Sequence, residues 1–446
     1  MKVGIIGAGP GGMFAAHTLI KEGIEVILFE QGKPMINRVC NKVSSCSCQR
    51  CDILEGVGGA GGFSDGKNVL SSGRGTGDRK DIFSDGDNSL IQEINEYMKS
   101  ETDTFEHHDV PVKTIDSGLF EFDGYAVTHF GTDGIIDFIL KMERTLLSYK
   151  NLTFKREMRV RNVQARGNGY WIEYDDGYVL VDKVIFATGI AGHPWVDKVL
   201  SSLGSVGTAG TAGFGIRFEG DSEVLAPLFD LHYDFKLKMK VGDIQLRSFC
   251  CNRNGHITNE NHRELGVINV NGHSFHSKTM KTNKSNFAII AMLDGERYGN
   301  PQDSVVRYGR KCNLAVAQRG GKLGTGVQSV EEFLTGSGSF PNYSHKQAFP
   351  SDLKESIPVK LSLGFKIFIS GLSKWINEKD KGNVIYFPEI KYFGRKIEVE
   401  FDSFKMKSSL GLEGIYVPGN ANGHLDSFVA CAVSGIKSSR NIIGGI

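Results

Sequence analysis

The chain has 446 residues, enough for two or three domains at roughly 150 residues each. Hydrophobic residues make up 40% and charged residues 23% of the chain, which is typical of a globular protein and excludes a disordered one. The 52 Lys and Arg residues balance 51 Asp and Glu residues, and the net charge of +1 argues against nucleic acid as the main partner. No apolar run of about 20 residues predicts a membrane span. Eight cysteines are too few for a disulfide scaffold, so we expect a cytoplasmic protein.

The N-terminal residues predict a βαβ unit. Lys2–Ile6 and Glu25–Phe29 are apolar runs typical of buried strands, and the residues from Gly11 to Glu22 have the apolar spacing of a helix. The turn between the first strand and the helix reads GAGPGG and fits the G-x-G-x-x-G pattern. In this context the pattern predicts a dinucleotide site.

Each part of this turn has a physical role in holding a dinucleotide. Gly7 permits the tight turn, Gly9 lets the backbone approach a pyrophosphate, and Gly12 lets the helix pack closely on the strand. The helix N-terminus attracts the phosphates. Glu30 follows the second strand, where an acidic side chain accepts hydrogen bonds from a ribose.

Two later segments indicate which dinucleotide is bound. A strand-like run, Val184–Phe186, leads into Ala187-Thr188-Gly189, and a second run, Ile415–Val417, leads into Pro418-Gly419-Asn420. Together with the N-terminal turn, this order resembles the FAD-binding flavoproteins of the glutathione-reductase and hydroxylase type. The resemblance implies that the turn at Ala187–Gly189 passes the cofactor. It also implies that the turn at Pro418–Asn420 contacts the ribityl-phosphate region of the cofactor. Asn420 stands where that family usually has an acid.

Further motifs resemble a narrower family of FAD-dependent dehydrogenases. GGAGGFSDGK at Gly58–Lys67 is similar to its GGAG-x-FSDGK segment, and HFGTD at His129–Asp133 is similar to its H-x-G-T-D segment. Arg247–Cys250 and Asn271–Ser274 are similar to its R-x-F-C and N-G-x-S segments. The chain departs from that family at Gly419–Val433, and its second cysteine stands beside Cys250 rather than at position 252.

We therefore expect an α/β fold: a discontinuous Rossmann-type FAD-binding domain with an inserted α+β substrate domain. The FAD-binding domain is expected at residues 1–75, 151–203 and 397–446, and the substrate domain at 204–396. Residues 76–150 are expected to form an insertion and a helix that leads back to the FAD-binding domain. The Gly-, Ser- and Cys-rich stretch from Cys40 to Asp103 reads as a long functional loop.

FAD is the predicted cofactor, and NAD(P)H is a candidate transient reductant. Arg38 matches a position that often contacts the cofactor in the similar flavoproteins. The predicted FAD-binding residues are Gly7, Gly9, Pro10, Gly12, Glu30, Gln31, Arg38, Gly59, Ser64, Val160, Ala187, Thr188, Gly189, Gly419 and Asn420.

The expected catalytic groups follow from the chemistry of a flavin. A flavin that accepts hydride gains negative charge, so we expect a cation or backbone dipoles near the ring. Lys67 and Arg247 are the candidate cations, and His273 is a candidate proton donor. We expect the ring between the Gly58–Lys67 loop, the Ala187–Gly189 turn and the Gly419–Gly423 turn, with residues 247–274 closing over it.

Several interpretations remain open for the four cysteines of this stretch, which are Cys40, Cys46, Cys48 and Cys51. Four thiolates can bind a metal, Cys46 and Cys51 can form a redox pair that faces the flavin, or the thiols have neither role. The spacing lacks two separated C-x2-C knuckles, so we assign no metal ligand. The sequence GGFSDGK at 61–67 also fits a phosphate-binding loop, but Asn68 replaces the Ser or Thr that would bind Mg²⁺.

The expected function is that of an FAD-dependent oxidoreductase that transfers hydride between a small organic substrate and the flavin. The expected partner is that small molecule, with neither nucleic acid nor a membrane involved. A flavin-dependent RNA-modifying enzyme is one alternative, because some of these share the fold. A non-catalytic FAD-binding scaffold is the other. The balanced charge argues against the first, and a flavin that resists reduction would favour the second.

Overall fold

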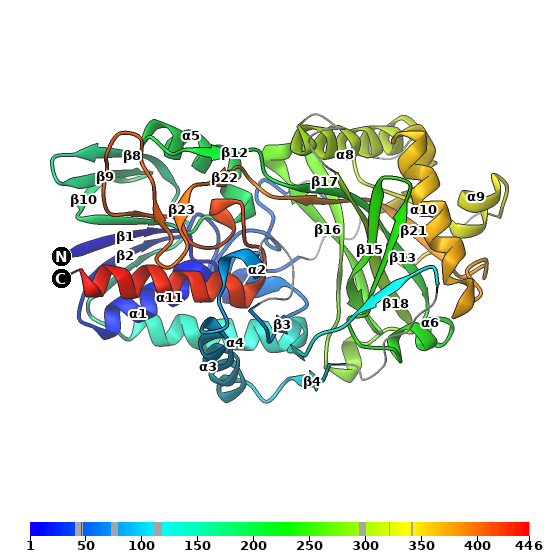
Figure 1. Ribbon diagram of the computed structural model, residues 1–446, viewed down its shortest axis with the longest axis horizontal. Helices are drawn as coiled ribbons and strands as arrows, with labels where there is room; N and C mark the ends of the chain where they lie inside the picture. Colours follow the sequence, from blue (N-terminus) through cyan, green and yellow to red (C-terminus); the bar gives the residue numbers. More distant parts are fainter. Residues whose placement is uncertain are drawn as a thin grey trace.

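The computed structural model describes residues 1–40, 46, 48–72, 79–110, 118–293, 300–320, 322–339 and 342–445. Two lobes lie side by side along the long axis of the molecule, and both chain termini lie at the outer end of the first lobe (Figure 1). Each lobe has its own large hydrophobic core. No helix in these ranges is both long and apolar enough to cross a membrane.

The first lobe is built on a seven-stranded sheet with the strand order β23-β24-β25-β11-β1-β2-β7. Five neighbouring strands are parallel, and β23 and β24 extend the sheet in antiparallel fashion. The strands come from three separate stretches of the chain, so the expected discontinuous Rossmann-type α/β fold is confirmed. Their bounds are β1 (Lys2–Ile6), β2 (Glu25–Phe29), β7 (Leu152–Lys155), β11 (Lys183–Phe186), β23 (Val399–Glu400), β24 (Lys405–Met406) and β25 (Ile415–Tyr416).

An antiparallel meander and several helices complete the first lobe. A turn at Asp175-Asp176-Gly177 joins two strands of the meander. The strands are β8 (Val160–Arg166), β9 (Gly169–Tyr174) and β10 (Gly177–Val181), and a small pair consists of β12 (Gly207–Thr208) and β22 (Lys396–Ile397). The helices are α1 (Pro10–Lys21), α2 (Arg79–Ile82), α3 (Asp87–Glu101), α4 (Gly131–Leu147), α5 (His193–Ser202) and α11 (Phe428–Gly444).

Helix α3 corrects the expectation of a long loop between Cys40 and Asp103. It spans Asp87–Glu101 and buries Leu90, Ile91, Ile94 and Met98 on one face, at the spacing of a helix. The flanking Gly, Ser and Asp residues dominate the composition of the stretch, and they masked this periodicity. The expected boundary between residues 75 and 76 lies outside the described residues.

The second lobe contains an eight-stranded sheet with the order β20-β19-β21-β13-β18-β15-β14-β5. All neighbouring strands are antiparallel except β19 and β20. The strands are β5 (Glu121–Asp123), β13 (Ala212–Asp221), β14 (Lys236–Val241), β15 (Ile244–Asn252), β18 (Lys284–Leu293), β19 (Thr325–Ser329), β20 (Ala348–Pro350) and β21 (Val384–Tyr392). Helices α6 (Ser222–Phe229), α8 (Pro301–Gln318), α9 (Val330–Thr335) and α10 (Val359–Gly371) contribute buried side chains to the same core.

Two smaller sheets lie where the lobes meet. One is the hairpin of β16 (His256–His262) and β17 (Val267–His273). The other has the order β3-β6-β4 and consists of β3 (Lys67–Val69), β6 (Val127–His129) and β4 (Glu106–His108). In Figure 1, β3 and β4 lie below the junction between the lobes.

Helices α1 and α11 approach each other through two glycines. They lie side by side in Figure 1, and a Cβ atom added to Gly435 would stand 2.1 Å from the carbonyl oxygen of Gly11. A Cβ atom on Gly11 would stand 3.3 Å from the carbonyl oxygen of Cys431. The backbones of the two helices therefore touch where α1 begins, beside the predicted dinucleotide turn.

We expect Gly435→Ala to lower the free energy of unfolding by about 1–3 kcal/mol, because the added methyl group overlaps the carbonyl oxygen of Gly11. Gly444→Ala is the matched control, since an added Cβ atom at Gly444 in the same helix meets nothing within 4 Å. Urea unfolding followed by circular dichroism measures both variants. Equal stability of the two variants would contradict this account of the helix contact.

Candidate active site

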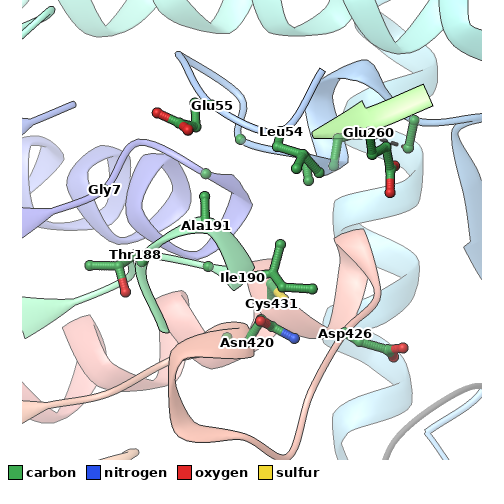
Figure 2. Close-up of a pocket in the computed structure, with 18 of the residues that line it drawn as sticks. Gly7, Leu54, Glu55, Thr188, Ile190, Ala191, Glu260, Asn420, Asp426 and Cys431 are labelled. Atoms are coloured by element: carbon green, nitrogen blue, oxygen red, sulfur yellow. Dashed lines mark hydrogen bonds between the residues drawn. The ribbon is translucent and has the colours of Figure 1, made fainter. Parts of the chain in front are cut away.

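A cavity of about 440 Å³ extends from the predicted dinucleotide turn to the second lobe. Leu54 and Glu260 face Ile190 and Asn420 across this space (Figure 2). Its wall contains the ends of β1 and β2, the loop that precedes β3, the turns after β11 and β25, and one face of the second lobe's sheet. The cavity lies at the carboxyl ends of the parallel strands, the usual ligand position in such sheets.

The glycine turn has the geometry that the sequence predicts. Gly7 has a φ of 100°, and an added Cβ atom there would lie 2.4 Å from the carbonyl oxygen of Ala187. A Cβ atom on Gly12 would lie 1.9 Å from the carbonyl oxygen of Gly7. Gly12 therefore packs behind the turn and does not line the cavity. A Cβ atom on Gly9 would meet only Gly59 Cα, at 3.8 Å, so Gly9 leaves room for a ligand at the N-terminus of α1.

Glu30 lines the cavity, and its carboxylate also holds three parts of the wall together. One oxygen accepts a hydrogen bond from the backbone N–H of Ala8 at 2.9 Å. The other accepts from the N–H groups of Gly32 at 2.8 Å and Gly56 at 3.1 Å. The sequence predicts only a ribose acceptor at this position. The structure adds a structural role, and each carboxylate oxygen can accept a further hydrogen bond from a ribose.

Arg38 does not line the cavity, so its contact with FAD stays a prediction. Its guanidinium group is buried and donates hydrogen bonds to the carbonyl oxygens of Asp52, Ile53, Val57 and Gly59 at 2.8–2.9 Å. Burial lowers the pKa of Arg38 to about 10. The side chain fixes the 52–59 loop from behind and acts on the cavity only through that loop.

The turns after β11 and β25 also line the cavity. Gly189 and Gly419 have φ values of 61° and 70°, a left-handed conformation that favours glycine. The hydroxyl of Thr188 is buried, and no described group forms a hydrogen bond with it. A ligand in the cavity can provide that partner, so the residues present fit a bound dinucleotide.

Asn420 lines the cavity, but its amide is already engaged by the protein. Its Oδ1 lies 2.7 Å from Nε2 of His193, and its Nδ2 donates to the carbonyl oxygen of Leu425 at 2.9 Å. The side chain therefore holds its own turn in shape. The acidic side chain at this end of the cavity is Asp426, which pairs with Lys391 at 2.7 Å.

Lys67 belongs to a chain of four buried charges that line the cavity. Its Nζ lies 2.8 Å from Asp65 and 3.5 Å from Asp234, and Lys236 lies 2.7 Å from the other oxygen of Asp234. These side chains are between 4% and 11% exposed. The four charges sum to zero, which makes their burial together tolerable. The sequence predicts a cation here, but not the two carboxylates that neutralise it.

The four charges in this cluster stabilise one another. Burial opposes ionisation of Asp65, but Lys67 and His129 outweigh it and lower the pKa of Asp65 below its usual range. Lys236 and Lys67 overcome the burial of Asp234 in the same way and lower its pKa. Burial likewise opposes the charge of Lys67, whose pKa the two carboxylates raise.

The other two predicted catalytic residues do not line the cavity. Arg247 lies on β15 with its guanidinium 5.4 Å from the ring centre of Phe249, and it is Phe249 that reaches the cavity wall. His273 is buried at the end of β17, 6.2 Å from the ring of Phe63, and burial lowers its pKa. Sequence motifs placed both residues in the right segment, but they do not say which members of a strand face a cavity.

Sequence reasoning missed several groups in the cavity wall. Cys250 has a φ of 49° at an irregularity in the pairing of β15 with β18, and it lines the cavity. Lys391 lies 4.5 Å above the ring of Phe249. Cys250 belongs to the R-x-F-C motif, but the motif gave it no role. No local motif marks Lys391, which lies on a strand that is distant in sequence. The missed lining residues include Asp234, Lys236, Phe249, Cys250, Glu260, Glu389, Lys391 and Asp426.

The cysteine segment lies beside the second lobe. Cys51 is buried, and its sulfur accepts a hydrogen bond from the N–H of Asn261 at 3.5 Å. Burial raises the pKa of Cys51 to about 11, so this thiol is protonated at neutral pH. Among the described residues, the thiols are not part of any group of ligand-type side chains close enough to share a metal ion.

Comparisons with known proteins agree with this geometry. The family described as FAD binding domain matches residues 1–73. The chain binds FAD. Flavin chemistry is redox chemistry, and the protein is an FAD-dependent oxidoreductase.

Other similarities are more distant. An uncharacterized protein of Clostridium beijerinckii is 24% identical over 452 residues, which cover 98% of this chain and 80% of that one. A salicylate hydroxylase structure is 13% identical, with a TM-score of 0.43, and covers 99% of this chain and 78% of that one. The 2,6-dihydroxypyridine-3-hydroxylase of Arthrobacter nicotinovorans is 12% identical, with a TM-score of 0.45, over 99% and 83% of the two chains. TM-scores this low do not define a shared reaction.

We expect Gly9→Val to abolish FAD binding without unfolding the protein, because the new side chain projects into the space beside Gly59. Gly444→Val is the control, since its side chain enters open space at the end of α11. The flavin absorbance of the purified protein and reconstitution with added FAD measure the effect. A folded Gly9→Val protein that retains stoichiometric FAD would place the pyrophosphate elsewhere.

We expect Asp234→Asn to destabilise the protein by about 3–5 kcal/mol at pH 7, because the change leaves Lys67 and Lys236 with one carboxylate between them. The pKa of Asp234 is lowered in the folded state, so its contribution is complete above the unfolded value of about 3.9. This contribution is lost as the pH falls below that value. Urea unfolding between pH 7 and pH 3 should show a difference from wild type that shrinks below about pH 4. Asp230→Asn is the control, because Asp230 forms an exposed pair with Arg253, and its free energy of unfolding should stay close to that of wild type at every pH. A stability difference for Asp234→Asn that does not change with pH would contradict the assignment.

Proposed function

We propose that this protein is a dehydrogenase or reductase that transfers hydride between a small organic substrate and FAD, as the resemblance to the GGAG-x-FSDGK family implies. One observation carries the proposal: the cavity that begins at the dinucleotide turn continues without a break to the second lobe. The segments at Gly59–Lys67, Ala187–Gly189 and Gly419–Asn420 all line this cavity, which supports a ring position between them.

The second lobe supplies the substrate side of the cavity. Phe249 and Cys250 from β15 and Lys391 from β21 line the cavity on this side. They lie beside the four charges, neutral in sum, that include Lys67. Glu260–Leu265, Asn269 and Asn271 from the β16–β17 hairpin also contribute. A wall of aromatic, amide and paired charged groups suits a small organic molecule with polar substituents.

Helix α11 provides a fixed positive dipole toward the cavity. Its N-terminal residues Ser427 and Phe428 line the wall, and the hydroxyl of Ser427 caps the helix by accepting from the N–H of Ala430 at 3.2 Å. Bound FAD supplies hydride chemistry and carries more negative charge when reduced. The α11 N-terminus lowers the energy of that charge without a further buried cation.

NAD(P)H is the proposed transient reductant. The sequence contains a single G-x-G-x-x-G turn after a strand, and FAD takes that turn. A nicotinamide donor would therefore enter the substrate side of the same cavity and leave before the organic substrate binds.

The test is anaerobic reduction of the FAD-loaded protein by NADH, NADPH and small organic donors, followed by reoxidation with candidate acceptors. We expect at least one donor to bleach the flavin. Lys67→Met leaves Asp65 and Asp234 with only Lys236, so the cavity gains one negative charge. We expect this variant to retain FAD and to be reduced at least about tenfold more slowly, which corresponds to about 1.4 kcal/mol in the barrier.

Lys238→Met is the matched control on β14. Lys238 pairs with Asp123 at 2.9 Å and does not line the cavity. The flavin of the Lys238→Met variant should therefore be reduced as fast as that of the wild type. Unchanged kinetics in Lys67→Met would place the chemistry elsewhere. A flavin that no donor reduces would favour the scaffold alternative, and salt-sensitive retention of RNA would favour an RNA-modifying enzyme.

A further inference from the structure

A cluster of metal-ligand side chains lies behind the cavity, on the three-stranded sheet and on the loop that follows β17. Glu106, His129 and His276 each offer one ligand atom, and these atoms lie within 4.8 Å of one another. Among the described residues, this is the one group of three or more such side chains at that spacing. Its members are far apart in sequence, so no local motif predicts it.

The fold fixes the three residues from two sides. Glu106 on β4 pairs directly with His129 on β6, which places their side chains next to each other on one face of the sheet. The loop that carries His276 is attached to the start of α4. There, Asp133 accepts hydrogen bonds from the N–H groups of His276 at 3.0 Å and Ser277 at 2.8 Å.

One nitrogen of each imidazole is already engaged by an oxygen atom. His129 Nε2 lies 3.3 Å from the carboxylate of Asp65 and 3.1 Å from the hydroxyl of Tyr233. His276 Nε2 donates to the carbonyl oxygen of His129 at 3.1 Å. Histidines that bind metals usually donate their second nitrogen to a carboxylate or a carbonyl in this way, which sets the tautomer and the direction of the ring.

The other nitrogen of each ring is left for a ligand. His129 is 3% exposed, and its Nδ1 has no hydrogen-bond partner among the described groups. His276 Nδ1 lies 3.5 Å from the carboxylate of Glu106, too long for a good hydrogen bond. A buried ring nitrogen without a partner is unfavourable, and a cation between the three ligand atoms would satisfy all of them.

The electrostatic surroundings suit a divalent cation. Glu106, Asp65 and Asp133 all lie against the two histidines, whereas the nearby Lys67 is already paired with Asp65 and Asp234.

We propose that Glu106, His129 and His276 bind one divalent first-row transition metal of the zinc type. Two imidazole nitrogens and one carboxylate oxygen suit such ions and leave a fourth position for water. The ion links the β3-β6-β4 sheet to the β17 loop of the second lobe and fixes the ring of His129, whose other side contacts Asp65 in the cavity wall. The sequence assigns no metal ligand, and the proposal departs from that expectation without involving the cysteines.

The experiment is calorimetric titration of the FAD-loaded protein with ZnCl₂ after its reactive thiols have been alkylated. We expect one zinc per chain in the wild type. Glu106→Gln and His276→Gln should each weaken binding at least about tenfold, because each change removes a ligand. His107→Gln is the matched control, since His107 is the next residue on β4, points to the other face, and contacts Asp109 and Thr128. This control should bind zinc like the wild type.

Two further measurements separate this site from other sites and from unfolding. The flavin absorbance of each variant reports on folding, and Glu106 carries the decisive test because it is half-exposed and lies outside the cavity. The spectrum of the Co²⁺-loaded, unalkylated protein should show ligand-field bands without a thiolate charge-transfer band. The proposal is overturned if wild type and Glu106→Gln bind zinc equally, if His107→Gln binds as weakly as Glu106→Gln, or if the cobalt spectrum shows thiolate ligation.

Discussion

The site depends on the carboxylate of Glu30. This side chain stands at the end of β2 and binds the N–H groups of Ala8, Gly32 and Gly56. It therefore joins the dinucleotide turn, the end of the second strand and the loop that leads to β3. Hydrogen bonds to a charged acceptor are stronger than neutral ones, so one buried carboxylate can hold three turns that are rich in glycine. Arg38 supports the same loop from the opposite side.

A second constraint is the neutrality of the buried charges in the cavity. Lys67 and Lys236 alternate with Asp65 and Asp234, and the two pairs come from different elements. The first pair belongs to the segment around β3, whereas the second belongs to the start of β14. The lobes are thus joined through ion pairs with little access to water, where each charge is favourable only while its partner is in place. The same four charged residues therefore line the cavity and connect the two lobes.

Glycine determines how closely these parts can approach. The contacts of Gly12 with Gly7 and of Gly435 with Gly11 bring α1 against both β1 and α11. As a result, the N-termini of α1 and α11 both face the cavity, which collects two positive helix dipoles at the site of a negatively charged cofactor. The role of Lys67 is correspondingly different from that of an isolated cation, because two carboxylates already balance its charge.

The sequence by itself determined the features that depend on neighbouring residues. The βαβ unit, the role of each glycine in its turn, and the segments at 58–67, 187–189 and 419–420 follow from contiguous patterns, and all of these segments reach one cavity. Helix α3 shows the limit of composition as a guide, because polar flanking residues hid its apolar face. Only the tertiary structure decided that Arg247 and His273 stay out of the cavity wall, and that Asp234 joins Lys67. The meeting of the two lobes brings Asp234 to Lys67 across more than a hundred positions of sequence. The packing of β15 and β17 decides which of their side chains face the cavity.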